Sequence, residues 1–234
     1  MQQFFDFPVT PAASFDNFIV CDGTLAACTF ARRIADPAEA DKLLYLHGPA
    51  GSGKSHLLKA VVRSVAPGGT MESYVSCRSF VRAGELVERF RGAPILAVDD
   101  LHLLRDDTGF RAELWEVFNE FYSSGRPVVM AGEHPPRELA QLDEHLVSRL
   151  LWGLVARLDV SDDASRRMII RKVAEDRQVL VPADAVEYIL ATTGREVSEL
   201  IGAFEKVYHL SMALKRKISV GLAREALSAG GGCP

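Results

Sequence analysis

The sequence predicts an α/β protein, in which a parallel five-stranded sheet with flanking helices is followed by a small helical domain. Two observations carry this prediction. Short apolar runs alternate with helical segments up to about residue 160, and from Asp163 onward the pattern is purely helical. Because parallel strands need a crossover between them, usually a helix, the alternation indicates a parallel sheet. We expect a tail over residues 1–14, the α/β domain over 15–161 and the helical domain over 162–234.

The first elements follow from turn residues and apolar runs. Residues 1–14 are interrupted by prolines, and Asp22 with Thr24 opens a helix that runs to about Ile34. Apolar runs without polar alternation are typical of strands that are buried on both faces. The strands expected on this basis are residues 43–46, 74–76, 94–99, 128–130 and 154–160.

The remaining helices follow from the helical period of their apolar side chains. The helix expected at 109–124 places its large apolar residues on one face, which should cover the sheet. These residues are Leu114, Val117, Phe118 and Phe121. Further helices are expected at about 57–62, 80–90, 163–177, 182–192, 195–217 and 219–228.

A glycine-rich loop joins the first apolar strand to the following helix. It reads Gly48, Pro49, Ala50, Gly51, Ser52, Gly53, Lys54 and Ser55. Glycines let the backbone fold around a phosphate, and the helix N-terminus supplies N–H donors. In this pattern Lys54 reaches the β- and γ-phosphates, and the Ser55 hydroxyl completes a magnesium shell. The loop therefore predicts binding of a nucleoside triphosphate with Mg²⁺.

Two adjacent carboxylates end the apolar run at 94–99. We expect this strand to lie beside the phosphate-binding loop and to deliver its last side chains to the phosphates. Asp99 would then hold the water shell of Mg²⁺, and Asp100 would orient and polarise the attacking water. Without the loop upstream, the same pair would be an ordinary start of a solvated turn.

Two arginines are further candidates for contacts with nucleotide phosphates. Arg149 precedes the last strand on a short helical segment, where it suits a finger that reaches the γ-phosphate of a neighbouring subunit. Arg195 opens a helix of the C-terminal domain, from which it would sense the phosphates. Spacing alone also allows both to be ordinary exposed arginines, because most arginines are solvated.

Composition and charge limit which ligands and which cellular compartment fit this protein. The net charge of −4 gives no global basic footprint of the kind that holds proteins on duplex DNA. The four cysteines lack CxxC spacing and the six histidines form no cluster, so neither a disulfide framework nor a zinc site is indicated. The sequence shows no secretory leader and no apolar run long enough to span a membrane. We expect a cytoplasmic protein in a reducing compartment.

Five separated segments, in order, resemble the ATPase module of the DnaA-type bacterial replication initiators, which are AAA+ proteins. The segments are residues 14–20, 48–58, 98–102, 135–139 and 148–154, and the resemblance covers about 14–228. It implies a parallel sheet with a helical lid, and binding of ATP or ADP with Mg²⁺. It also implies that Arg149 is an arginine finger, and it adds His56, directly after the loop, to the nucleotide-binding residues.

The sequence departs from the initiators at several places. Ser198 stands where the family's second sensor is an arginine, and Arg195, one turn earlier, would substitute imperfectly. Glu133 stands near the first sensor, where the family has small polar residues and an Asp. The stretch 80–94 has room for one helix only, without the initiators' extra helix that grips single-stranded DNA. The chain stops after the lid, at Pro234, so sequence-specific binding of duplex DNA is not expected.

A module without these DNA-binding devices resembles the Hda group, initiator paralogues that act with the sliding clamp to stimulate ATP hydrolysis by the initiator. That resemblance implies the DnaA initiator and the polymerase clamp as partners, and it allows self-association. Gln2, Phe5 and Phe7 are candidates for a short clamp-binding peptide, or for a tail that packs on the protein itself. Asp100 is shorter than the Glu of strongly hydrolytic relatives, which favours a weak ATPase. A helicase-loader-type ATPase and a non-catalytic ADP-bound clamp adaptor remain alternatives.

Overall fold

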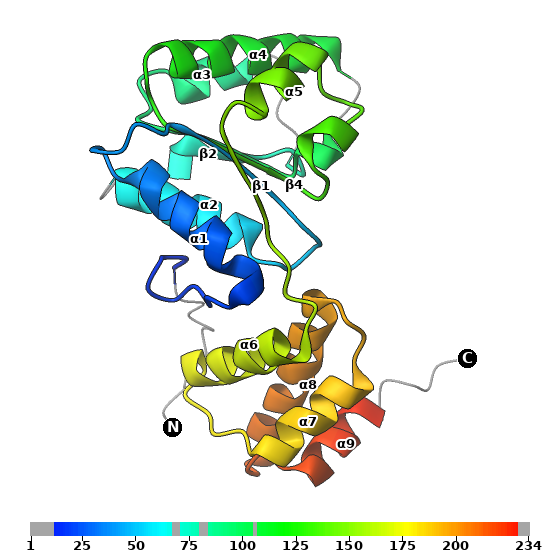
Figure 1. The fold of residues 1–234 in the computed structure, drawn as a ribbon. Helices are drawn as coiled ribbons and strands as arrows, with labels where there is room; N and C mark the ends of the chain where they lie inside the picture. The colour runs from blue at the N-terminus through cyan, green and yellow to red at the C-terminus, as the bar shows by residue number, and fades with distance from the viewer. Residues whose placement is uncertain (1–11, 67–70, 80–83, 105–106, 229–234) are drawn as a thin grey trace, which may run out of the picture.

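The computed structural model describes residues 12–66, 71–79, 84–104 and 107–228. A five-stranded sheet with helices on both faces comes first, and a group of helices follows it (Figure 1). The strands are β1 Leu43–His47, β2 Tyr74–Ser76, β3 Leu96–Asp99, β4 Val128–Gly132 and β5 Leu154–Arg157. The helices are α1 Asp22–Ala35, α2 Lys54–Val65, α3 Glu85–Phe90, α4 Thr108–Ser123, α5 Glu144–Leu150, α6 Asp163–Asp176, α7 Ala183–Thr192, α8 Val197–Leu214 and α9 Val220–Ser228. The predicted fold class is confirmed.

The strands are parallel and lie in the order β2-β3-β4-β1-β5. The strand that carries Asp99, β3, is not a direct neighbour of β1, because β4 lies between them. Val128 of β4 pairs with Leu43 of β1 on one side and with Leu96 of β3 on the other. Alternating strands and helices predict parallel pairing, but they do not determine strand order. The carboxyl ends of β1 and β3 still lie at the same edge of the sheet.

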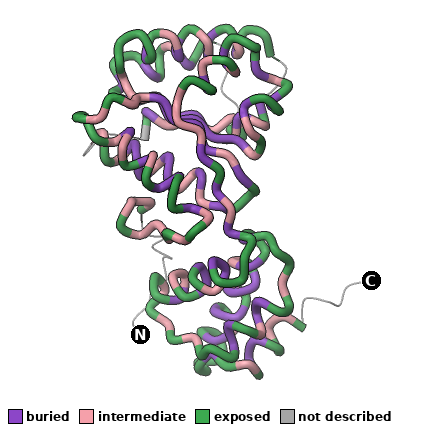
Figure 2. The backbone as a smooth tube through the Cα atoms, viewed as in Figure 1, coloured by how far each residue is buried: buried purple, intermediate pink, exposed green. Residues whose placement is uncertain are grey.

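Two apolar cores cover the two faces of the sheet. In β1, Leu44 and Leu46 join the core with α1 and α2, whereas Leu43 and Tyr45 join the core with α3, α4 and α5. This alternation follows from the two-residue period of a strand, and burial of both sets explains the unbroken apolar run. Figure 2 shows the buried backbone running through the centre of the sheet. The face predicted for α4 is buried, as expected.

The C-terminal helices enclose a core of their own. Ile189 of α7, Phe204 and Val207 of α8 and Leu222 of α9 are buried in it. Helix α6 begins where the Asp162 carboxylate accepts a hydrogen bond from the Ser165 N–H, at 2.8 Å. In Figure 1 these helices lie below the sheet, on the side of α1 and α2. None of the described helices is both long enough and apolar enough to cross a membrane.

Several boundaries differ from the prediction. Strand β5 ends at Arg157 because the chain then turns toward α1, where the Asp159 N–H donates to the Gly23 carbonyl at 2.9 Å. Helix α8 begins at Val197, since Glu196 before it has extended backbone angles, so Arg195 precedes the helix. Helix α3 begins at Glu85, and the predicted start at residues 80–83 lies outside the described residues.

Candidate nucleotide-binding site

The glycine-rich loop connects β1 to α2 and has the backbone conformation that its glycines permit. Gly48, Gly51 and Gly53 have φ angles of 148°, 74° and 101°. A Cβ at Gly48 would lie 2.2 Å from the carbonyl oxygen of Leu158, and one at Gly53 would lie 2.8 Å from Cε2 of Phe18. Side chains at these positions would therefore clash as well as strain the backbone.

The Lys54 ammonium lies inside this loop. Its Nζ donates to the carbonyl oxygens of Gly48 and Pro49, both at 2.7 Å, and the residue is only 6% exposed. Burial lowers the pKa of Lys54, and the negative charge of nearby Asp99 and Glu133 opposes that shift. A phosphate in the loop would replace two neutral acceptors with an anionic one.

Two further observations fit a phosphate. The hydroxyl of Ser52 is buried and has no hydrogen-bond partner in the described part of the chain. An unpaired buried hydroxyl costs about 1–3 kcal/mol, which a ligand oxygen would recover. Helix α2 begins after Gly53, which has no side chain to cap its first N–H groups. These residues fit the phosphates of a nucleotide.

Asp99 is fully buried and its carboxylate is fixed from two sides. Oδ1 accepts from the backbone N–H of Asp100, and Oδ2 accepts from the hydroxyl of Tyr74, both at 2.8 Å. The side chain of Ser55 lies near the Tyr74 hydroxyl and acts to lower its pKa. Burial, and then the charge of Asp99, raise the pKa of Tyr74, so it stays protonated as a donor. The tyrosine thus holds Asp99 and lies near Ser55, the other predicted magnesium ligand.

Our sequence interpretation missed Tyr74 because it was assigned only to a short strand. The only indication of its role is the pairing of β2 with β3, in which Ser76 lies opposite Asp99. This pairing brings the start of β2 close to the Asp99 carboxylate. Ser55 and Asp99 present hard oxygen atoms next to the phosphate loop, which suits Mg²⁺ when phosphates complete its shell. The donor set therefore fits the ion.

Asp100 points to the end of β2. Its Oδ2 accepts from the hydroxyl of Ser76 at 2.7 Å and lies 3.6 Å from Nε of Arg78. The backbone of Asp100 is left-handed, with φ 57°, a conformation that Asp tolerates better than most residues. Ser76 and Arg78 thus engage the carboxylate of Asp100. The expectation that this carboxylate orients the attacking water remains a prediction.

Glu133 follows β4 and touches the phosphate loop. Its carbonyl accepts from the N–H of Gly48 at 3.2 Å. His102 holds it in place, since the N–H of Glu133 donates to Nδ1 at 3.3 Å and Oε1 lies 3.5 Å from Nε2. Burial lowers the pKa of Lys54, and the negative charge of Glu133 partly opposes that shift. The residue that departs from the initiators at the first sensor is therefore close enough to influence a bound phosphate.

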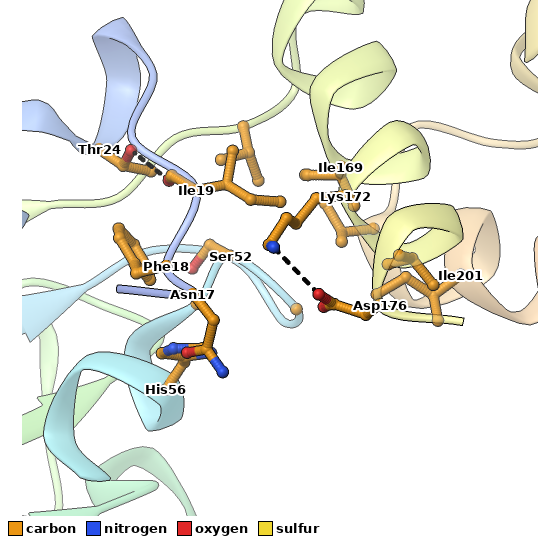
Figure 3. Close-up of a pocket in the computed structure, with 15 residues that line it drawn as sticks. Asn17, Phe18, Ile19, Thr24, Ser52, His56, Ile169, Lys172, Asp176 and Ile201 are labelled. Carbon is orange, nitrogen blue, oxygen red and sulfur yellow. Dashed lines mark hydrogen bonds and ion pairs between the residues drawn. The ribbon is translucent and has the colours of Figure 1, made fainter. Parts of the chain in front are cut away.

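A cavity of about 220 Å³ opens beside the loop (Figure 3). Much of its wall is apolar, with Phe18 and Ile19 on one side and Ile169 and Ile201 on the other. Its apolar lining residues are Phe18, Ile19, Val160, Ile169, Val173, Val197 and Ile201. Such a pocket suits a flat aromatic group such as a nucleobase.

Polar groups also face this cavity. Lys172 and Asp176 of α6 form an ion pair at 3.0 Å, which Figure 3 shows on the lid side. His56 contributes to the opposite wall: its Nε2 lies 2.8 Å from the carbonyl oxygen of Ser14, and its ring packs edge-on against Phe18. Burial lowers the pKa of His56, which favours the neutral ring. His56 thus fixes the N-terminal segment that forms this wall.

The second-sensor region meets the loop through backbone. A Cβ at Gly51 would lie 3.1 Å from the N atom of Ser198, so the start of α8 packs directly on the loop. The side chain of Ser198 turns to Glu196 at 3.3 Å. Arg195 is exposed and its Nη1 donates to the carbonyl of Ser161 at 3.2 Å. Its proposed contact with phosphates remains a prediction.

The structure does not bring Arg149 to the phosphate loop. Arg149 lies in the last turn of α5, where its guanidinium carbon is 4.5 Å from the ring centre of Trp152 and 5.3 Å from that of Tyr122. Helix α5 packs on the same face of the sheet as α4, opposite α2 (Figure 1). The remaining candidates, Gln2, Phe5 and Phe7, lie outside the described residues.

The strand order, the loop between β1 and α2, the buried acidic end of β3 and the helical lid define an AAA+ ATPase module. The family model of the bacterial DnaA ATPase domain matches residues 9–157, so the chain belongs to that family. A model of the lid domain of Hda matches residues 162–227. The chain is a DnaA-related, Hda-like nucleotide-binding module, as the sequence resemblance implied.

Solved structures agree with this assignment. Domain III of the DnaA replication initiation protein of Thermotoga maritima is 27% identical, with a TM-score of 0.83, over 95% of this chain and 98% of that chain. AMPPCP-bound DnaA from Aquifex aeolicus is 21% identical, with a TM-score of 0.73, over 88% and 68%. The RuvB branch-migration motor of Thermotoga maritima shares the fold at 18% identity, with a TM-score of 0.70, over 93% and 72%.

Proposed function

We propose that this protein regulates replication initiation by stimulating ATP hydrolysis on the DnaA initiator, together with the sliding clamp. Its own site would bind ATP or ADP with Mg²⁺, and its Arg149 would act on the nucleotide of a DnaA subunit. Membership of the DnaA family and the Hda-type lid support the initiator as partner. The clamp would be bound by the segment that contains Gln2, Phe5 and Phe7.

The geometry of the site supports the proposal that this protein binds a nucleotide of its own. The phosphates would enter the loop at Lys54 and the unpaired hydroxyl of Ser52, and the base would enter the adjacent apolar cavity. Ser55 and Asp99 would hold the ion. When bound, Mg²⁺ would neutralise phosphate charge. AMPPCP, an ATP analogue, is bound in the related DnaA from Aquifex aeolicus.

The position of Arg149 is the observation that carries the proposal. Arg149 borders neither the cavity beside the loop nor the second cavity that Glu133 and Arg157 line. It lies instead on the opposite face of the sheet from α2. An arginine that assists phosphoryl transfer must contact the γ-phosphate, so Arg149 can do so only on another subunit.

In the test, this protein is added to ATP-loaded DnaA in the presence of clamp on DNA. The rate of ATP hydrolysis is then measured. We expect Arg149→Ala to retain nucleotide affinity but to lose stimulation by about 100-fold or more, because arginine fingers contribute about 10³–10⁵ to the rate. Arg224→Ala is the matched control, since Arg224 is also an arginine over an aromatic ring, that of Tyr188, in the lid. Wild-type stimulation by Arg149→Ala would rule out the role.

One observation favours a second candidate, a non-catalytic adaptor that keeps ADP as a structural ligand. The carboxylate of Asp100 is engaged by Ser76 and Arg78. A chain that cannot orient water would turn over slowly and hold its nucleotide. This candidate predicts tight ADP binding and no effect of Arg149→Ala on the partner, so the same experiment separates the two.

A further inference from the structure

Arg149 is held between two aromatic rings that come from different elements. Tyr122 belongs to α4, and Trp152 belongs to the turn after α5. The guanidinium carbon lies 5.3 Å and 4.5 Å from their ring centres. Trp152 is 65% exposed and Tyr122 is 37% exposed, although large aromatic side chains are usually well buried. The two rings therefore form an exposed site around one cation.

The aromatic faces are the contacts that hold this guanidinium. Within the described residues, the side chain of Arg149 makes no hydrogen bond or ion pair, whereas most other arginines there have one. A ring face attracts the cation without accepting its in-plane N–H groups in the way a carboxylate does. The fork of donors on Arg149 is left available for an anionic oxygen.

The core supports these two residues in different ways. The ring of Tyr122 stacks on the buried ring of Phe118, with centres 5.7 Å apart and planes within 14°. Trp152 precedes Gly153, and a Cβ at Gly153 would lie 2.5 Å from Cγ of Leu43 in β1. The turn thus rests directly on the strand that leads into the phosphate loop. The core therefore supports the ring of Tyr122 and the backbone that carries Trp152.

We propose that Tyr122 and Trp152 are positioning residues that hold Arg149 ready for a phosphoryl oxygen of a second, nucleotide-bound subunit. This inference rests on the proposed function of Arg149. A free arginine side chain must lose rotamer freedom when it docks, whereas one that is already ordered loses less. The rings therefore contribute to rate through the orientation of Arg149, and they do so without touching the nucleotide.

The first measurement needs no partner. In ¹⁵N-labelled protein, the Nε–Hε signal of Arg149 is assigned by its loss in Arg149→Ala, and its order parameter is measured. We expect an ordered signal in the wild type, a mobile one in Trp152→Ala, and an ordered one in Trp152→Phe, which keeps an aromatic face. Leu151→Ala is the control, since Leu151 is an exposed apolar neighbour and should leave Arg149 ordered.

The second measurement uses the same variants to stimulate ATP hydrolysis by the initiator at increasing concentrations. We expect Trp152→Ala to lower the maximal stimulated rate about tenfold with little change in half-saturating concentration. Trp152→Phe should restore most of the rate, and Leu151→Ala should match the wild type. A residue that only docks the partner would instead raise the half-saturating concentration.

Three results would overturn the inference in distinguishable ways. If Arg149 stays ordered in Trp152→Ala, the rings do not position it. If Arg149 becomes mobile but the maximal rate is unchanged, while Arg149→Ala abolishes stimulation, the finger stands and its positioning is irrelevant to rate. If Arg149→Ala itself stimulates normally, the proposed function fails and the inference fails with it.

Discussion

At the scale of single residues, the site depends on charges and hydroxyls that are buried before any ligand arrives. The Lys54 ammonium is stabilised by two loop carbonyls, and the Ser52 hydroxyl has no partner in the described part of the structure. Burying such groups is costly unless they are satisfied. Binding of phosphate would satisfy both. The loop therefore combines a glycine-dependent backbone with polar groups whose best partner is an anion.

Lys54→Ala should weaken the binding of ATP and ADP by about 10- to 100-fold, because it removes a charge-assisted hydrogen bond to phosphate. Titration calorimetry with each nucleotide measures the effect. Lys42→Ala provides the control, since the Lys42 ammonium donates to the Asp36 carbonyl away from the loop. Unchanged affinity in Lys54→Ala would contradict the assignment of the loop.

At the scale of elements, Tyr74 connects three of them. It begins β2, donates to Asp99 at the end of β3, and lies near Ser55 at the start of α2. The fully buried carboxylate of Asp99 depends on this donor, because its other oxygen is satisfied by the N–H of Asp100. Tyr74 therefore fixes Asp99, one of the two predicted magnesium ligands.

Tyr74→Phe should lower the free energy of unfolding by about 1–3 kcal/mol, because it leaves a buried carboxylate oxygen without its donor. Denaturant titration without nucleotide measures this change. For comparison, Tyr188→Phe, in the lid, should change stability by less than about 0.5 kcal/mol. Equal stability of Tyr74→Phe and the wild type would show that Asp99 does not rely on the hydroxyl.

The elements also show what could be predicted from sequence. The phosphate loop was predictable because its glycines, lysine and serine are adjacent in the chain and lie between a strand and a helix. The position of β3 in the sheet was not predictable, because strand order depends on pairing with β4 across long sequence separations. Tyr74 was missed as a site residue for the same reason, since its partner Asp99 lies 25 residues further along the chain. Trp152 lies close to Arg149 in sequence, but the grouping of two rings around Arg149 depends on Tyr122 of α4, which only the fold brings there.

At the scale of the whole molecule, the nucleotide site and the proposed arginine finger lie on different faces of the sheet. The nucleotide cavity lies between the N-terminal segment, the phosphate loop and the lid, with α8 packed on the loop at Gly51. Arg149 and its two aromatic rings lie across the sheet, beside α4 and α5. One subunit would thus offer a site for its own nucleotide and an arginine for a neighbour's, a head-to-tail arrangement.

The most direct test of this claim is a measurement in which only one of the two proteins carries labelled ATP. DnaA carrying labelled ATP is mixed with this protein carrying unlabelled ADP, and single-turnover release of labelled phosphate is followed with clamp on DNA. Our interpretation predicts rapid release that requires Arg149, and no acceleration when this protein carries the label. Release that is accelerated only from this protein's own nucleotide, or that is equally fast with Arg149→Ala, would contradict it.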